Sequence, residues 1–258
     1  MIIKILTLLL WIIIIRYIYA FIKIKIYKKL RNKMERSTKL PNQKGNGKEN
    51  ILWIGDSTAV GIGASKKEYS MPGRLGKEKP DATIEVIART GAKIKDALEF
   101  LRKSKLNHYN LIVINIGANN IVRFTPLKEI EKDMLFLINE AKKKSKKVIF
   151  LHGGNLAASR LLPFPINALY SLRTRKVRKI YKKIAKATKT VYIDLYTSIS
   201  DFPRFRNDKS LFSRDKFHPS NEGYAVWYEV LKEAIKPTNK NHDTSKLIRK
   251  MIRDYKNQ

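Results

Sequence analysis

Residues 50–58 of the chain read Asn-Ile-Leu-Trp-Ile-Gly-Asp-Ser-Thr, and the rest of the sequence can be interpreted around this stretch. Residues 51–54 form a short apolar run that stops at a glycine, and small residues follow it. Such a run, bounded by a turn signal, is typical of a buried β-strand. Ser57 would then lie at the carboxyl end of the strand, where open α/β sheets bind their ligands. The same residues also fit an ordinary helix N-cap, and this stretch alone does not separate the two interpretations.

Strand-like and helix-like runs alternate from this stretch to residue 235. Short apolar runs predict five strands, at residues 51–54, 83–88, 111–116, 148–151 and 191–195. Helical spacing of apolar residues predicts helices at residues 94–103, 126–143, 166–188 and 221–235. Residues 66–79 contain Pro72 and Gly73, and we expect a loop there with at most a short helix. Strands alternating with helices predict an α/β protein, a three-layer α/β/α sandwich with a five-stranded parallel sheet.

The N-terminal segment predicts one transmembrane helix before this domain. Residues 2–22 are almost wholly apolar, and their length suits a single membrane span. Lys4 can reach an interface, whereas Arg16 shortens the charge-free core. A secretory signal peptide is the rival interpretation, but Ala20 lies between two aromatic residues and no small-x-small cleavage site follows. We expect residues 1–30 to be an uncleaved anchor, with a deeply inserted interfacial helix as the alternative.

The flank after the apolar segment is basic, with Lys23, Lys25, Lys28, Lys29, Arg31 and Lys33. The positive-inside rule predicts that this flank, and the domain after it, face the cytoplasm. The flank can also bind anionic headgroups on either side, so a periplasmic or extracellular domain stays open. We expect a flexible linker at residues 31–49, the globular domain at 50–236 and a basic tail at 237–258.

The composition excludes several classes of site. The chain has 258 residues, 54 Lys and Arg against 22 Asp and Glu, and no cysteine, which excludes disulfides, thiolate nucleophiles and cysteine-ligated zinc. A formal charge of +32 favours an anionic partner. Because the lysines are scattered over every predicted helix, we expect this basic surface to meet water and membrane lipid rather than nucleic acid. The four histidines show no metal-ligand spacing such as HxxxH, so no metal or other cofactor is expected.

One histidine lies in a pattern that suits catalysis. His218 follows Asp215 by three residues on a predicted loop, so the aspartate can fold back onto its Nδ1 atom. That bond would fix the tautomer and leave Nε2 free as a base. Taken alone, the histidine also fits a surface or capping residue. The turns after the first three strands all contain glycine and are expected at one edge of the sheet, which favours a catalytic site there.

Four short motifs follow one another along the chain: Gly55-Asp56-Ser57, Gly91, Gly117-Ala118-Asn119-Asn120, and Asp215 with His218-Pro219. In these motifs the chain resembles the SGNH/GDSL hydrolase family of GDSL-type esterases and lipases. The resemblance covers about residues 51–235. Asn120 stands where the family has an aspartate, which puts the local hydrogen bonding in question, and the family's fourth motif is not recognisable at residues 151–155.

The resemblance implies an SGNH, flavodoxin-like fold and an esterase mechanism that needs no cofactor. It implies that Ser57 is the nucleophile, that His218 is its general base and that Asp215 orients the imidazole. The oxyanion hole would consist of the backbone N–H groups of Ser57 and Gly91 and the side-chain amide of Asn119. Asp56 is expected to be a turn residue rather than a member of the triad.

The substrate is expected to be an acyl ester such as a lysophospholipid, although no substrate-binding residue is indicated. Residues 160–170 are apolar and could form a lid or an acyl-chain wall, or only pack as a long loop. Alternatives are an acetyl-ester hydrolase or an acyltransferase acting on a glycan, and a degenerate binding protein for anionic lipid or nucleic acid. The oligomeric state is not indicated.

Overall fold

The computed structural model describes residues 2–159, 161–196 and 208–235. Its centre is a parallel sheet with the strand order β2-β1-β3-β4-β5. The strands are β1 (Glu49–Gly55), β2 (Ala82–Ala88), β3 (Leu111–Asn115), β4 (Val148–His152) and β5 (Val191–Asp194). The predicted five-stranded parallel sheet is therefore confirmed, and each strand end lies close to its predicted position. The strand order reverses at β1, so the carboxyl ends of β1 and β3 border the crevice where such sheets bind ligands.

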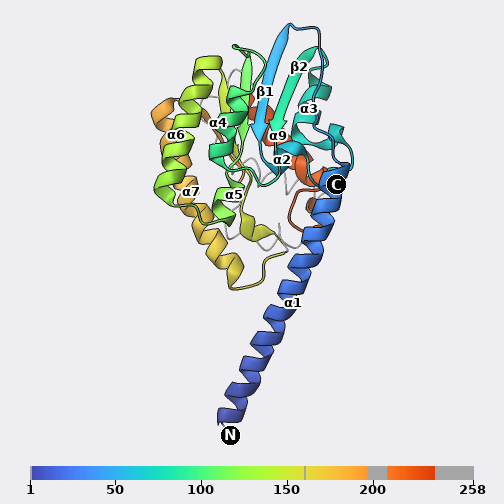
Figure 1. Ribbon diagram of the computed structural model, residues 1–258, viewed down its shortest axis with the longest axis vertical. Helices are drawn as coiled ribbons and strands as arrows, with labels where there is room; N and C mark the ends of the chain where they lie inside the picture. The colour runs from blue at the N-terminus through green and yellow to red at the C-terminus, as the bar shows by residue number, and fades with distance from the viewer. Residues whose placement is uncertain (1, 160, 197–207, 236–258) are drawn as a thin grey trace.

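Helices cover both faces of the sheet, which confirms the three-layer prediction (Figure 1). One face carries α3 (Met71–Glu78) and α9 (Asn221–Ile235), and the other carries α4 (Ile94–Arg102), α6 (Leu127–Lys144) and α7 (Ile166–Thr188). Ile51 and Trp53 of β1 pack into the first core, whereas Leu52 and Ile54 pack into the second. Successive strand side chains point to opposite faces, so a central strand needs apolar residues at every position.

Short elements complete the domain. The 3₁₀ turns are η1 (Lys67–Tyr69), η2 (Leu156–Ala158) and η3 (Lys209–Leu211), and two short helices are α2 (Ser57–Val60) and α5 (Ala118–Val122). Helix α5 was not predicted, and α2 was anticipated only as the alternative of a helix N-cap after the first strand, because one turn is too short to show a helical period. Helix α3 occupies part of the expected loop at 66–79, where the Ser70 hydroxyl accepts from the Gly73 N–H at 3.2 Å. The basic tail at 237–258 lies outside the described residues.

Helix α1 (Ile2–Ser37) projects from the domain and is long and apolar enough to cross a membrane (Figure 1). A signal sequence would share that length and composition. The side chains of residues 2–19 are all exposed. The helix continues beyond residue 30, the predicted end of the anchor, because residues 31–37 contain no helix breaker and several good helix formers. The first part of the expected linker is therefore helical.

The rest of the expected linker lies along the edge strand β2 rather than being a free spacer. The backbone groups of Gln43 and Ile84 exchange two hydrogen bonds, of 3.0 and 2.9 Å. The side-chain oxygen of Asn42 accepts from the Val86 N–H at 2.7 Å. A polar composition suggested flexibility, but an edge strand offers unpaired backbone groups that such a segment can satisfy. The domain boundaries themselves stay a prediction.

Candidate active site

The turn after β1 fits both interpretations of residues 50–58, a helix N-cap and a serine at the ligand-binding end of a strand. Asp56 is the N-cap of α2, and its Oδ1 atom accepts from the backbone N–H and the hydroxyl of Thr58, at 3.1 and 2.9 Å. The Thr58 hydroxyl also lies 2.9 Å from the side-chain oxygen of Asn115 on β3. Burial raises the pKa of Asp56, although the hydrogen bonds from Thr58 oppose this effect. Since Asp56 supplies the cap, the hydroxyl of Ser57 is left to face the crevice.

The structure brings Ser57, His218 and Asp215 together in one hydrogen-bonded row. The Nε2 atom of His218 lies 2.8 Å from the Ser57 hydroxyl, across 161 positions of sequence. On the other side of the ring, Nδ1 lies 2.5 Å from Oδ2 of Asp215. All three residues are buried. This is the geometry in which a serine, a base and an orienting carboxylate can act together.

The second carboxylate oxygen of Asp215 also accepts hydrogen bonds. Oδ1 accepts from the Ser213 hydroxyl at 2.8 Å and from the backbone N–H groups of Phe217 and His218 at 3.0 and 2.9 Å. Burial alone would raise the pKa of Asp215, but the hydrogen bonds and the charge of His218 outweigh burial and lower it. The aspartate therefore stays ionised beside the imidazole and fixes its orientation.

The two other residues of the expected oxyanion hole lie at the neighbouring strand ends. Gly91 follows β2 in the left-handed backbone region, with φ +79°, which favours glycine. Asn119 is on α5, after β3, and its Nδ2 atom donates to the Ala92 carbonyl at 3.0 Å. One amide N–H is used there, and Nδ2 carries a second. Gly91, Asn119, Ser57 and His218 all line one cavity of about 520 Å³.

Asn120, which departs from the family pattern, is well satisfied. Its Oδ1 atom accepts from the Ile94 N–H at the start of α4, at 3.0 Å, and its Nδ2 atom lies 3.4 Å from the Thr125 hydroxyl. An asparagine therefore supplies the acceptor that this helix start needs without adding a buried charge.

Sequence reasoning missed the close approach of Tyr181 to Gly117. This glycine has φ +117°, and a Cβ atom there would lie 2.2 Å from the hydroxyl of Tyr181 on α7. The tyrosine ring packs against the ring of His152, at 5.7 Å between centroids. His152 is buried, and burial lowers its pKa to about 4. No local signal links these three residues, because they come from three separate elements.

Sequence reasoning also missed the contribution of α1 to the cavity. The helix supplies five lining residues, Ile24, Tyr27, Lys28, Arg31 and Glu35. From the predicted wall at 160–170, Leu161, Leu162 and Tyr170 line the same cavity, while Arg160 lies outside the described residues. The helix period of 3.6 residues explains the spacing of the α1 side chains, but only the fold places that face on the domain.

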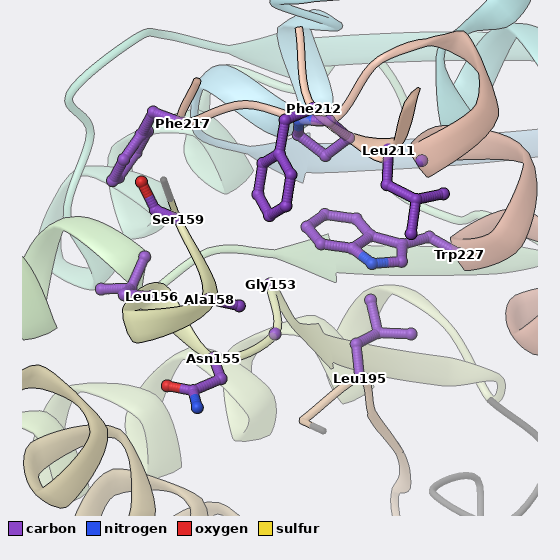
Figure 2. A pocket seen from close by; sticks show the side chains of 13 residues that line it. Gly153, Asn155, Leu156, Ala158, Ser159, Leu195, Leu211, Phe212, Phe217 and Trp227 are labelled. Atoms are coloured by element: carbon purple, nitrogen blue, oxygen red, sulfur yellow. The ribbon is translucent and has the colours of Figure 1, made fainter. Parts of the chain in front are cut away.

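A second cavity, seen in Figure 2, is also lined by Phe217 and lies among Leu156, Phe212 and Trp227. Its volume is about 40 Å³, enough for about one water molecule. Of these two cavities, the larger is the one that contains Ser57 and is lined by α1. Within the described residues, no three or more His, Asp or Glu side chains are grouped so as to hold a metal ion.

The model of the GDSL-like lipase/acylhydrolase family matches residues 53–226, which is more than half of the chain. The chain belongs to this family. The match extends from β1 into α9 and so includes every residue of the row described above. Its members are ester hydrolases, and the domain of this chain is an ester hydrolase of the GDSL type. No curated protein matches the chain.

Solved structures of this GDSL hydrolase fold are similar at low identity. A lipolytic G-D-S-L family protein from Veillonella parvula DSM 2008 has 17% identity and a TM-score of 0.59, over 72% of this chain and 97% of that one. The acetylxylan esterase Axe2 from Geobacillus stearothermophilus has 21% identity and a TM-score of 0.52, over 77% and 98%. A lipase/acylhydrolase from Enterococcus faecalis has 19% identity and a TM-score of 0.55, over 74% and 99%. These likenesses show the fold.

Proposed function

We propose that this GDSL hydrolase cleaves a carboxylic acyl ester through an acyl-enzyme intermediate on Ser57. The observation that carries the proposal is the row Ser57–His218–Asp215, with contacts of 2.8 and 2.5 Å. A serine hydroxyl is a weak nucleophile by itself, and an adjacent imidazole held in one tautomer activates it. The fixed, ionised Asp215 provides that hold.

The reaction proceeds in two balanced steps. As Ser57 Oγ attacks the ester carbonyl, its proton passes to Nε2 of His218, which then returns it to the leaving alkoxide. Water then attacks the acyl-enzyme and gives a proton to His218, the carboxylic acid leaves, and the proton returns to Ser57. The N–H groups of Ser57, Gly91 and Asn119 stabilise the negative oxygen, at about 3–4 kcal/mol for each donor.

The test is a full-length Ser57→Ala variant in detergent, with Ser104→Ala as a matched control on the far side of the domain. We expect Ser57→Ala to lose hydrolysis of p-nitrophenyl acetate and labelling by a fluorophosphonate probe, while Ser104→Ala keeps both. Full activity of Ser57→Ala would overturn the proposal. An unlabelled, inactive wild type would favour the alternative of a binding protein for anionic lipid or nucleic acid.

An acetyl ester on a glycan is the second candidate substrate, because one structural neighbour is an acetylxylan esterase. Transfer of the acyl group to an acceptor other than water would use the same residues. Comparing acetylated oligosaccharides with longer acyl esters, and identifying the products, separates these possibilities from lipid hydrolysis.

A further inference from the structure

One face of α1 borders the active-site cavity, although no residue of the helix is fully buried. Ile24, Tyr27, Arg31 and Glu35 recur at helical spacing, and all four line the cavity that contains Ser57. The Tyr27 ring also contacts the loop that carries the histidine, because Nζ of Lys216 lies 5.1 Å from its centroid. These contacts belong to the part of α1 that follows the apolar segment, so the cavity wall and the membrane-length segment are consecutive parts of one helix.

The geometry of α1 puts the cavity close to a membrane surface. A span needs about 20 apolar residues, which the exposed segment ending near Ile22 provides. With a rise of about 1.5 Å per residue, the lining residues from Ile24 to Glu35 lie about 3–20 Å beyond that segment. This range covers the headgroup region and the water next to it.

Exposed apolar side chains mark the same end of the domain. Phe164, Leu169 and Leu172, in and just before the first turns of α7, are 67%, 51% and 50% exposed. Figure 1 shows the N-terminal end of α7 at the end of the domain from which α1 projects. Large apolar side chains on such a surface suit contact with the acyl boundary of a bilayer.

The wall of the cavity is basic. Lys28 and Arg31 of α1 and Arg123 after α5 contribute three cations, against Glu35 and the Asp215 that is bonded to His218. Arg123 reaches over the oxyanion turn, since a Cβ atom on Gly91 would lie 3.4 Å from its Nη2 atom. An ester whose headgroup carries negative charge would meet these cations while its carbonyl approaches Ser57.

From this arrangement we propose that α1 is both the membrane anchor and a wall of the substrate site, and that the substrate is an anionic membrane lipid ester. The inference rests on the proposed function of Ser57, which it deepens by naming the substrate class. The apolar tail of such a lipid stays in the bilayer beside α1 and Phe164. Its anionic headgroup lies against Lys28, Arg31 and Arg123, and its ester lies at Ser57.

The test uses the full-length protein in phospholipid vesicles, with lysophosphatidylglycerol as the anionic ester and lysophosphatidylcholine as the zwitterionic one. We expect the wild type to hydrolyse the anionic ester about tenfold faster, a preference of the size that one or two basic side chains give near a membrane. Lys28→Glu with Arg31→Glu removes that preference. Lys29→Glu with Lys33→Glu, at α1 positions that do not line this cavity, has the same net charge and keeps it.

Each outcome decides the inference separately from the proposed function. If both double variants lose the preference for the anionic ester equally, the role of α1 as a wall of the substrate site is refuted. The same conclusion follows if Lys28→Glu with Arg31→Glu keeps the preference. Hydrolysis of p-nitrophenyl acetate without hydrolysis of either lipid would overturn the membrane substrate but leave Ser57 as the nucleophile. Fluorophosphonate labelling reports whether a variant is folded, and Lys28→Gln with Arg31→Gln replaces the charge reversal if labelling is lost.

Discussion

The buried His152 makes the stability of this hydrolase depend on pH. Burial lowers the pKa of His152 to about 4 in the folded chain; the charge of Asp194 opposes this effect and that of Arg178 adds to it. In the unfolded chain the pKa is about 6.5. Below pH 6.5 the unfolded state therefore binds a proton that the folded state does not, so stability falls as the pH is lowered from about 6.5 to about 4.

The size of the effect follows from these two pKa values. One pKa unit corresponds to about 1.4 kcal/mol, so the full loss across the window is about 3 kcal/mol. Between pH 7 and pH 5 the loss of unfolding free energy from this one group is about 2 kcal/mol. Other groups that titrate in acid, including Asp215, contribute equally to the wild type and to a variant that changes only His152.

The assay is denaturant unfolding of full-length protein in detergent, followed by near-ultraviolet circular dichroism at pH 7 and pH 5. His152→Phe keeps a ring beside Tyr181 but cannot bind a proton, so we expect it to lose about 2 kcal/mol less than the wild type over this range. His108→Gln is the matched control, since His108 is exposed, and it should behave as the wild type does. An equal pH dependence in His152→Phe and the wild type would refute the linkage.

Two further predictions concern the oxyanion side of the site. Asn119→Ala should lower kcat/KM for p-nitrophenyl acetate by about 10²–10³-fold with little change in the thermal midpoint, because it removes one donor; a loss below threefold would contradict that role. Gly117→Ala should destabilise the fold by about 3 kcal/mol, from a left-handed backbone and a Cβ atom 2.2 Å from the Tyr181 hydroxyl. Adding Tyr181→Phe to Gly117→Ala removes the hydroxyl and should restore part of the lost free energy of unfolding, measured by denaturant titration. If nothing is restored, the strain lies in the backbone alone.

Local patterns in the sequence predicted the elements and their chemistry. The apolar runs predicted all five strands, and burial on both faces explains why the central strands β1, β3 and β4 are apolar at most positions. The edge strands β2 and β5 are only partly buried and carry polar residues as well. The three-residue spacing of Asp215 and His218 made their contact possible, and the structure contains it. Gly91 was predicted as a turn, and its φ of +79° is one that other residues rarely adopt.

Contacts between distant parts of the chain were decided by the tertiary structure alone. The Tyr181 hydroxyl lies close to Gly117, and α1 lines the cavity that contains Ser57. No local sequence pattern predicts either contact. The polar composition of the segment before β1 predicted a free linker. In the structure, the backbone of Gln43 forms hydrogen bonds with Ile84 on the edge strand β2. A helical or strand period reports which face of an element is apolar, but the element that covers that face depends on how the whole chain packs. The sequence of residues 50–58 therefore determined a strand, a helix cap and the position of Ser57 at the strand end. The packing of the whole domain places His218 beside Ser57, although the two are 161 positions apart in sequence.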